Sequence, residues 1–537
     1  MSHDSSAPMS TTDAPNRGTL LVASFLTLIA AGMGFAVRGG ILGSWATQYG
    51  FTNTELGTIT GGGLVGFGVV ILLASLITDK VGYKAIMLLA GVLQIGSYFL
   101  TVAAGPVFKE SGKDATYMLL YWGMFMFSVS CGLCECVINP LVATLYPKQK
   151  VHYLNILHAG WPAGLVLGAL VGIVMGKMAW EVQLGMFLVP VIAYFGMSLI
   201  NKFPLSEASA AGVSFGTMLL EFASPVLLLL LLLHACVGYV ELGTDSWISK
   251  ITGTIAEGHG LYLFIYASLV MTVLRFVAGP IVEKINPLGL LCLSAALGAA
   301  GLYLIGSVNS VALVWVAVTV YSLGKTFLWP TMLGVVGERF PKGGALTMGA
   351  IGGVGMLSAG LLGGPGIGYK QDYFASQKLQ EEAKETYERY ASGAENGFLV
   401  FPKVKGLDGA KVGVLSDEGK ALAGDVKILQ DAKTYDTDKN IKPLNEWWQK
   451  AQTTKDKDKA PVTAATLHGG QMAMKYTALV PLTMFFGYLL LVIYFASTGG
   501  YKAVRIDATG QPQETNMPLS AGRAMSDGES GPTAGQA

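Results

Sequence analysis

Charged residues are scarce in this chain, at 71 of 537 positions or 13%. A soluble globular protein carries about 25% charge, which argues against a large water-soluble enzyme. The 36 basic and 35 acidic residues nearly cancel, so no basic field is present that would bind nucleic acid. Hydrophobic residues make up 52% of the chain and mean hydropathy is +0.50. These figures predict an integral membrane protein.

Cysteine is also rare, and its five positions all fall in apolar stretches, so no disulfide framework is implied. Cys131, Cys134 and Cys136 have a spacing at which thiolates can bind zinc, but no second Cys or His pair follows nearby. We therefore favour small apolar packing residues over a metal site, and we expect no metal and no cofactor. No Ser/His/Asp set, phosphate loop or metal pair is present, so we expect no enzyme.

Twelve apolar stretches are long enough to cross a membrane as helices, which takes roughly 18 residues or more. We therefore expect an all-α integral membrane fold with twelve transmembrane helices in two six-helix halves. The predicted spans begin near Thr19, Gly57, Lys84, Tyr117, His152, Trp180, Pro225, Gly260, Leu288, Val311, Gly344 and Tyr476.

One soluble segment interrupts this pattern, because 32 of the 71 charged residues lie within Lys370–Lys459. Its Gln377–Arg389 stretch predicts an exposed helix, and Asp436–Lys459 predicts a polar loop around Trp447–Trp448. The segment is long enough for a small domain, and a partly ordered cap is the alternative. The predicted organisation is a disordered tail (1–18), the N-terminal half (19–200), a central cytoplasmic loop (201–224), spans 7–11 (225–368), an extracytoplasmic insert (369–470), span 12 (471–505) and a disordered tail (506–537).

Basic residues in the short loops predict the orientation. With both termini in the cytoplasm, the inside loops hold eight Lys or Arg residues and the short outside loops hold four. This excess agrees with the positive-inside rule. It places the soluble segment on the extracytoplasmic side of the membrane.

Ionisable and polar groups inside the spans are the candidate site residues, because each is costly in lipid unless it faces a cavity or a partner. Glu135 and Asn139 lie four residues apart and share one helix face. Asn155, His158 and Trp161 follow in the fifth span. A carboxylate, amides, an imidazole and an indole suit a sugar-sized polar ligand. The alternatives are an ion pair between Glu135 and Arg38, and a hydrogen-bonded interior histidine at His158.

The second half holds a polar set of its own. Lys325 and Trp329 lie one turn apart in the tenth span, where the lysine can pair with Glu241 or Asp245 or contact the solute. Arg275, followed by Glu283 and Lys284, is interpreted as the second-half copy of a structural loop motif.

Four stretches resemble the major facilitator superfamily and, within it, the fucose/glucose/galactose:proton symporter family. The loop Ala74-Ser-Leu-Ile-Thr-Asp79-Lys-Val-Gly82-Tyr-Lys84 is similar to the superfamily's loop motif, with Ala74 where that motif begins with Gly. The family resemblance rests on Gly132-Leu-Cys-Glu135-Cys-Val-Ile-Asn139-Pro140, on Leu154-Asn155-Ile-Leu-His158-Ala159 with Gly164, and on Val237-Gly-Tyr-Val-Glu241-Leu-Gly-Thr-Asp245-Ser-Trp247.

The resemblance implies alternating access by two six-helix halves around a central cavity. It also implies that Glu135 and Asn139 line that cavity, that Asn155 lies near the solute, and that protonation of an acid drives uptake. The family's functional Asp in the first span aligns with Ile41, and Arg38 lies one turn earlier. This departure leaves Glu135 or Glu241 as the coupling acid. Arg38 also raises an anionic solute as an alternative, since its guanidinium fork suits a carboxylate.

The leading hypothesis is therefore a secondary active transporter that imports a monosaccharide or sugar acid by proton or sodium symport. We expect it to act as a monomer in the lipid bilayer of a bacterial inner membrane. The alternatives are an anion carrier using Arg38 and Lys325, and a non-transporting membrane sensor of solutes. The proposed solute-binding residues are Arg38, Glu135, Asn139, Asn155, His158, Trp161, Glu241, Asp245, Trp247, Lys325 and Trp329, with Glu135 and Glu241 coupling protons and Asp79, Gly82, Lys84 and Arg275 forming the loop motif.

Overall fold

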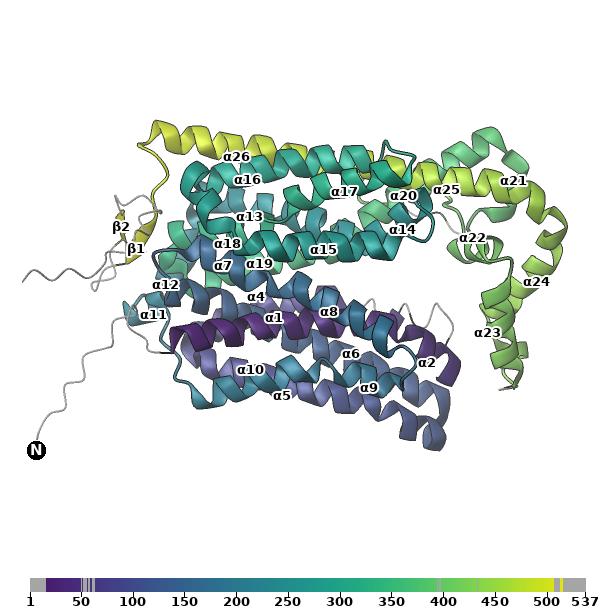
Figure 1. The fold of residues 1–537 in the computed structure, drawn as a ribbon, viewed down its shortest axis with the longest axis horizontal. Helices are drawn as coiled ribbons and strands as arrows, with labels where there is room; N and C mark the ends of the chain where they lie inside the picture. Colours follow the sequence, from purple (N-terminus) through teal and green to yellow (C-terminus); the bar gives the residue numbers. More distant parts are fainter. Residues whose placement is uncertain are drawn as a thin grey trace, which may run out of the picture.

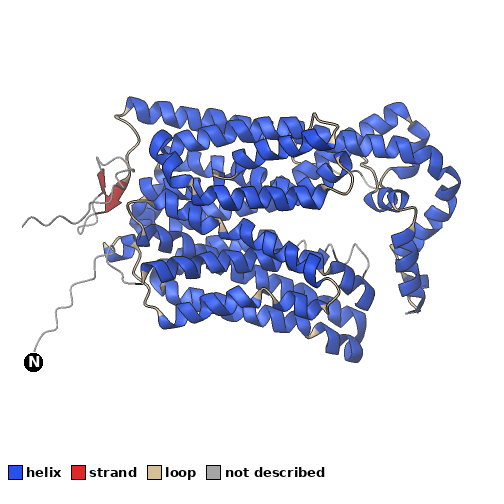
Figure 2. Cartoon of the chain, viewed as in Figure 1, coloured by secondary structure: helices blue, strands red, loops and turns tan. Residues whose placement is uncertain are grey.

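The computed structural model describes residues 16–49, 51, 56, 58–59, 63–393, 395, 397–431, 433–506 and 512–514. Helices dominate, in two bundles that lie side by side (Figures 1 and 2). A group of shorter helices projects from one end of the molecule, and a two-stranded sheet lies at the other (Figure 1). Most of the predicted tails 1–18 and 506–537, and the predicted start of the second span at Gly57, fall outside the described residues.

The first bundle is formed by the N-terminal helices, which are apolar around most of their circumference, as expected for membrane spans. Glycines allow close helix contacts: a Cβ on Gly164 of α8 would lie 2.8 Å from the Met33 amide nitrogen of α1. The helices of this bundle are α1 (Arg17–Gly40), α2 (Leu42–Tyr49), α4 (Gly63–Val81), α5 (Tyr83–Val102), α6 (Ala104–Leu145), α7 (Lys150–His158), α8 (Gly160–Met175), α9 (Trp180–Gly185) and α10 (Leu188–Ile200).

The second bundle repeats this architecture. Two of its spans contain a single π-helical turn, at Tyr239–Gly243 and Ala359–Gly363, and the two turns contact each other through Gly243 and Gly363. The helices of this bundle are α13 (Pro225–Gly238), α14 (Thr244–Ile255), α15 (Gly260–Phe276), α16 (Ala278–Ile305), α17 (Val311–Lys325), α18 (Leu328–Arg339), α19 (Gly344–Ser358), α20 (Gly364–Glu382), α25 (Lys455–Thr477) and α26 (Leu479–Ser497).

Ten helical stretches of the described chain are long and apolar enough to cross a membrane, and Gly260–Phe276 is a shorter apolar helix. The prediction of an all-helical, multi-pass membrane protein is thus confirmed. The count of twelve spans stays a prediction.

The charged segment forms a helical domain between α20 and α25, both of which run on from the second bundle (Figure 1). It has a hydrophobic core of its own, which includes Leu379, Tyr390, Leu415 and Trp448. The expected polar loop at Asp436–Lys459 is wrong, because one face of that stretch packs into this core as helix. The further helices are α21 (Lys384–Tyr390), α22 (Gly409–Ser416), α23 (Lys420–Asp431) and α24 (Ile441–Ala451).

A buried carboxylate, Asp458, forms an ion pair that joins the two ends of this insert. Asp458 of α25 is fully buried and accepts hydrogen bonds from Arg389 and from Thr386 of α21 (2.8 Å). Burial alone would raise the pKa of Asp458, but hydrogen bonds from Arg389, Thr454 and Thr386 together hold it below its ordinary value of 3.8. Because the folded-state pKa is the lower one, this stabilisation is present above about pH 4 and is lost as the pH falls through the folded-state pKa.

We therefore predict that Asp458→Asn destabilises the insert by about 1–3 kcal/mol, since Arg389 loses its carboxylate partner. Hydrogen–deuterium exchange should increase in α21 and at the start of α25 at pH 7, and the difference from the native chain should shrink below about pH 4. The exposed neighbour Asp456→Asn is the matched control. Equal exchange in both variants would contradict a stabilising role for the pair.

Short elements lie at the opposite end of the molecule. The central segment contains α11 (Glu207–Ala210) and α12 (Phe215–Leu220), and strand β1 (Val504–Ile506) pairs with β2 (Pro512–Glu514). Tyr501 donates a hydrogen bond of 2.7 Å to the buried Glu338 at the end of α18. The predicted disorder after residue 505 therefore does not hold for residues 512–514, which are paired.

Candidate functional site

A buried polar cluster lies in the first half, where the sequence placed it. The Glu135 carboxylate accepts a hydrogen bond of 2.7 Å from the Asn139 amide one turn later on α6. The Asn139 carbonyl oxygen lies 2.8 Å from Nε2 of His158, at the end of α7. All three side chains are at most 4% exposed. Glu135 and Asn139 thus share one helix face, as predicted, and the structure adds a hydrogen bond between them and a contact to His158.

Arg275 connects this cluster to the second half. Its guanidinium donates to the backbone oxygen of His158 (2.7 Å), to the backbone oxygen of Thr326 (2.7 Å) and to the Glu241 carboxylate (2.8 Å). Arg275 and Glu241 are 1% and 3% exposed. A polar path therefore runs from Glu135 to Glu241 across the boundary between the bundles, with His158 contributing its ring to Asn139 and its backbone oxygen to Arg275.

Asn155 crosses the same boundary. Its amide donates to Oγ1 of Thr331 on α18 (3.2 Å), while its own carbonyl oxygen is buried and has no hydrogen-bond partner among the described residues. One oxygen of Glu241, Oε2, is likewise buried and has no partner in the part of the chain that the structure describes. These two buried acceptors therefore have hydrogen-bonding capacity left.

Lys325 pairs with Asp245 and not with Glu241. The ammonium of Lys325 donates to Asp245 of α14 and lies 5.2 Å from the centre of the Tyr321 ring. Trp247 of α14 donates its indole N–H to the Gly364 oxygen of α20 (2.8 Å). Both contacts tie α14 to its neighbours within the second half.

Two predicted indoles pack against other rings, and one of them meets His234, which was not among the predicted site residues. Trp161 lies 5.7 Å from Phe35, and Trp329 lies 4.6 Å from His234, between ring centres. His234 is fully buried, and within the described residues neither of its ring nitrogens has a hydrogen-bond partner. An imidazole directly after the leucine run of Pro225–Leu233 was the available signal, since a polar group inside a span usually faces the interior of the bundle.

Arg38 does not form the ion pair with Glu135 that was one alternative for it, and its role in solute binding stays a prediction. Its guanidinium is 1% exposed, stacks on Phe127 at 3.9 Å and Phe187 at 4.8 Å, and donates to Ser97 of α5. These contacts all lie within the first bundle, and no ion pair joins Arg38 to Glu135 among the described residues. The cation is stabilised by ring faces, which the spacing of charges along the sequence does not reveal.

Arg38→Lys should therefore keep solute affinity near normal while lowering stability by about 1–2 kcal/mol, because an ammonium cannot reproduce the double stacking. Thermal unfolding without solute and binding of solute to the purified variant measure the two effects. A tenfold or greater loss of affinity with unchanged unfolding temperature would place Arg38 in the solute path instead.

The loop motif gathers at one end of the molecule. Gly82 has a positive φ of 88°, which a side chain would strain, and Lys84 donates to the backbone oxygens of Leu199 (2.8 Å) and Asn201 (2.9 Å). Asp79 accepts from the Ala345 amide at the start of α19 (3.1 Å). Arg275 was expected to belong to an equivalent loop. The structure buries it in the polar path instead, because α15 continues to Phe276 and holds its side chain against Glu241.

This same end holds the two bundles together. Lys150 donates to the Gly337 oxygen across the boundary (3.0 Å) and pairs with Glu207 of the central segment (2.8 Å). Hydrogen bonds between the bundles at Asp79 and Lys150 lie at this end, and those at Asn155 and Arg275 lie at or beside the polar path. In the described structure, the two bundles are thus bonded to each other at the end that carries the central segment.

The thiols of the predicted cysteine cluster form hydrogen bonds with other side chains. Cys131 accepts from Gln94 (3.7 Å), and Cys134 donates to Tyr194 (3.9 Å). Within the described residues, no group of three His, Cys, Asp or Glu side chains is arranged to hold a metal ion.

Comparison with known families decides the membership of this chain. The family model described as Major Facilitator Superfamily matches residues 24–364. The chain belongs to the major facilitator superfamily. It is a multi-pass membrane protein of a family of transporters. No curated protein matches the sequence significantly.

Solved structures share the fold at low sequence identity. The fucose:proton symporter FucP of E. coli is 17% identical with a TM-score of 0.54, covering 67% of this chain and 92% of that one. The proton:xylose symporter XylE is 14% identical with a TM-score of 0.55, covering 70% and 90%. The human organic anion transporter TETRAN is 14% identical with a TM-score of 0.54, covering 88% and 100%. At these identities the likeness concerns the fold.

Proposed function

We propose that this superfamily member imports a small polar solute by proton symport, with alternating access of two six-helix halves. The solute that we propose is a monosaccharide. The supporting observation is the polar path that links Glu135, through Asn139, the ring and the backbone oxygen of His158, and Arg275, to Glu241 in the other half. Two buried carboxylates at its ends supply the proton-binding groups that such coupling requires.

The path couples protonation to movement of the halves. Loading a proton on Glu241 removes the charge that holds Arg275, and Arg275 also bonds the His158 oxygen of the opposite half. The ion pair and the contact between halves therefore weaken together. Loading a proton on Glu135 makes its carboxyl group a donor as well as an acceptor, which changes what Asn139 and His158 offer to a solute.

The charges in the site favour a neutral solute over an anion. Arg38 stacks on rings inside the first half, and Lys325 is neutralised by Asp245. The two cations of the anion-carrier hypothesis are thus both engaged, and a sugar acid would need one of them released. Sodium remains the alternative coupling ion.

We propose that the twelve-span chain lies in a bacterial inner membrane as a monomer, with both termini in the cytoplasm and the insert outside. The excess of Lys and Arg in the loops on one side supports this orientation. This orientation can be tested in intact cells by labelling introduced cysteines with a membrane-impermeant reagent. The two positions are Glu446→Cys in the insert and Lys342→Cys in the short 3₁₀ helix Pro341–Gly343. Labelling of the insert position alone is expected.

Uptake in proteoliposomes tests the function itself. Purified protein should accumulate labelled L-fucose or D-xylose when the outside is acidic, and a proton ionophore should abolish the accumulation. Binding without accumulation would favour the solute-sensor alternative. Accumulation driven by a sodium gradient and insensitive to the ionophore would replace the proton with sodium.

A further inference from the structure

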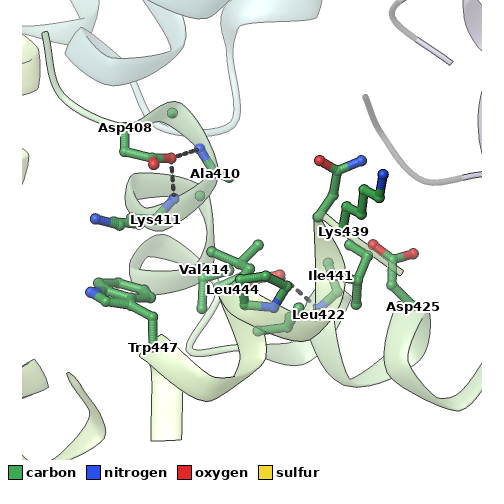
Figure 3. Close-up of a pocket in the computed structure, with 16 residues that line it drawn as sticks. Asp408, Ala410, Lys411, Val414, Leu422, Asp425, Lys439, Ile441, Leu444 and Trp447 are labelled. Carbon is green, nitrogen blue, oxygen red and sulfur yellow. Dashed lines mark hydrogen bonds between the residues drawn. The ribbon is translucent and has the colours of Figure 1, made fainter. Parts of the chain in front are cut away.

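The insert carries a hollow that the transport path does not use. It lies between α22, α23 and α24 and has a volume of about 680 Å³ (Figure 3). Small-molecule sites usually occupy roughly 300–1,000 Å³. The hollow is therefore large enough for a small organic solute.

One side of the hollow is apolar. Val414, Leu422 and Ile441 are 6%, 3% and 6% exposed and belong to the core of the insert. Leu444 and Trp447, one helical turn apart on α24, extend this surface outward (Figure 3). A buried base with a partly open indole provides a flat apolar face for a ligand.

The indole is held in place by its neighbours. Tyr390 meets its ring edge-on at 5.3 Å, and the Lys411 ammonium lies 5.4 Å from its centre. Lys411 is in turn fixed by the backbone oxygens of Arg389 (3.2 Å) and Ala391 (3.3 Å). Lys411 is thereby engaged and Trp447 is positioned before any ligand arrives, which lowers the entropy cost of binding.

The rim supplies hydrogen-bonding groups that have capacity left. Asp408 uses one oxygen, Oδ1, to accept from the amides of Ala410 (3.0 Å) and Lys411 (3.2 Å), as Figure 3 shows. Its other oxygen accepts no hydrogen bond from the described residues. The side chains of Lys439 and Asn440 are exposed at the rim and likewise have no partner in the described chain.

We propose that this hollow is a second binding site, for a polyhydroxylated solute of monosaccharide size. A sugar ring offers a C–H face to Trp447 and Leu444 and hydroxyl groups to Asp408, Lys439 and Asn440. The inference rests on the proposed function, since it assigns to the insert the same class of solute as the transport path. Because α20 and α25 run unbroken from the second bundle into the insert, a solute bound there is held near one mouth of the transporter.

Binding stoichiometry tests the proposal with the full chain in lipid nanodiscs and labelled L-fucose and D-xylose as probes. Equilibrium dialysis should give two sites per native chain. The rim variant, Lys439→Ala/Asn440→Ala, should retain one site. The variant Trp447→Leu should also retain one site. The matched control Lys427→Ala/Gln449→Ala changes two exposed side chains of α23 and α24 outside the hollow and should retain two. Initial uptake at low solute concentration should fall about twofold in the rim variant, with unchanged maximal rate.

The outcomes separate this inference from the proposed function. One site per native chain, unaffected by the rim variant and lost in Asn139→Ala, would overturn the insert site and leave transport standing. One site lost only in the rim variant would support the insert site and contradict the central site. Absence of binding of either sugar would overturn both.

Discussion

Glu135→Gln should abolish proton-driven accumulation of solute while preserving binding and exchange of solute across the membrane. The glutamine keeps the size of the protonated acid and its hydrogen bond with Asn139, but it cannot release a proton. With one proton per solute, a pH difference of one unit supplies about 1.4 kcal/mol and supports roughly tenfold accumulation. The variant should instead equilibrate the solute at a ratio of about one.

Proteoliposome uptake under an imposed pH gradient measures the accumulation, and counterflow with preloaded solute measures the exchange. Asn139→Asp should be measured beside Glu135→Gln. It retains a hydrogen-bonding side chain beside Glu135 and His158 but adds a second acid to the cluster. If Glu135→Gln accumulates solute at the native level and with the native pH dependence, Glu135 is not the coupling group. Glu241 then becomes the leading candidate.

Arg275→Met should have the largest effect on stability. Removing one partner of a buried ion pair leaves the other charge uncompensated, which costs about 3–5 kcal/mol. Here the loss also removes the hydrogen bonds from Arg275 to the backbone oxygens of His158 and Thr326. The yield of folded protein and the unfolding temperature should both fall sharply.

The double variant Arg275→Met/Glu241→Gln should recover most of the lost stability, because no unpaired charge remains. Thermal unfolding of the two single variants and the double variant gives the coupling energy between the residues. Lys325→Met/Asp245→Asn is the matched pair in the same half, and it lacks a contact across the boundary. We expect only the Arg275 and Glu241 variants to change the balance between inward-open and outward-open states. Additive losses in the Arg275 and Glu241 cycle would contradict a functional ion pair.

The spacing of polar residues was sufficient where the partners lie on one helix or on neighbouring turns. Glu135 and Asn139 were expected on one face because they lie four residues apart, and the hydrogen bond between them follows from helix geometry. Composition separated the charged segment Lys370–Lys459 from the apolar spans, because so many ions would be costly in lipid. Its helical core at α24 was missed, since the apolar face there consists of few residues between many charges.

Composition and hydropathy by themselves determined that this protein is an all-helical membrane protein, because long apolar stretches can satisfy their backbone groups in lipid only as helices or closed barrels. Sequence motifs determined its superfamily resemblance. Only the tertiary structure decided which charges meet. Arg38 and Arg275 look alike along the chain, yet one stacks on two phenylalanines within a bundle and the other binds Glu241 and the opposite half. The physical reason is that a long arginine side chain can reach several helices, and the packing of those helices selects its partner.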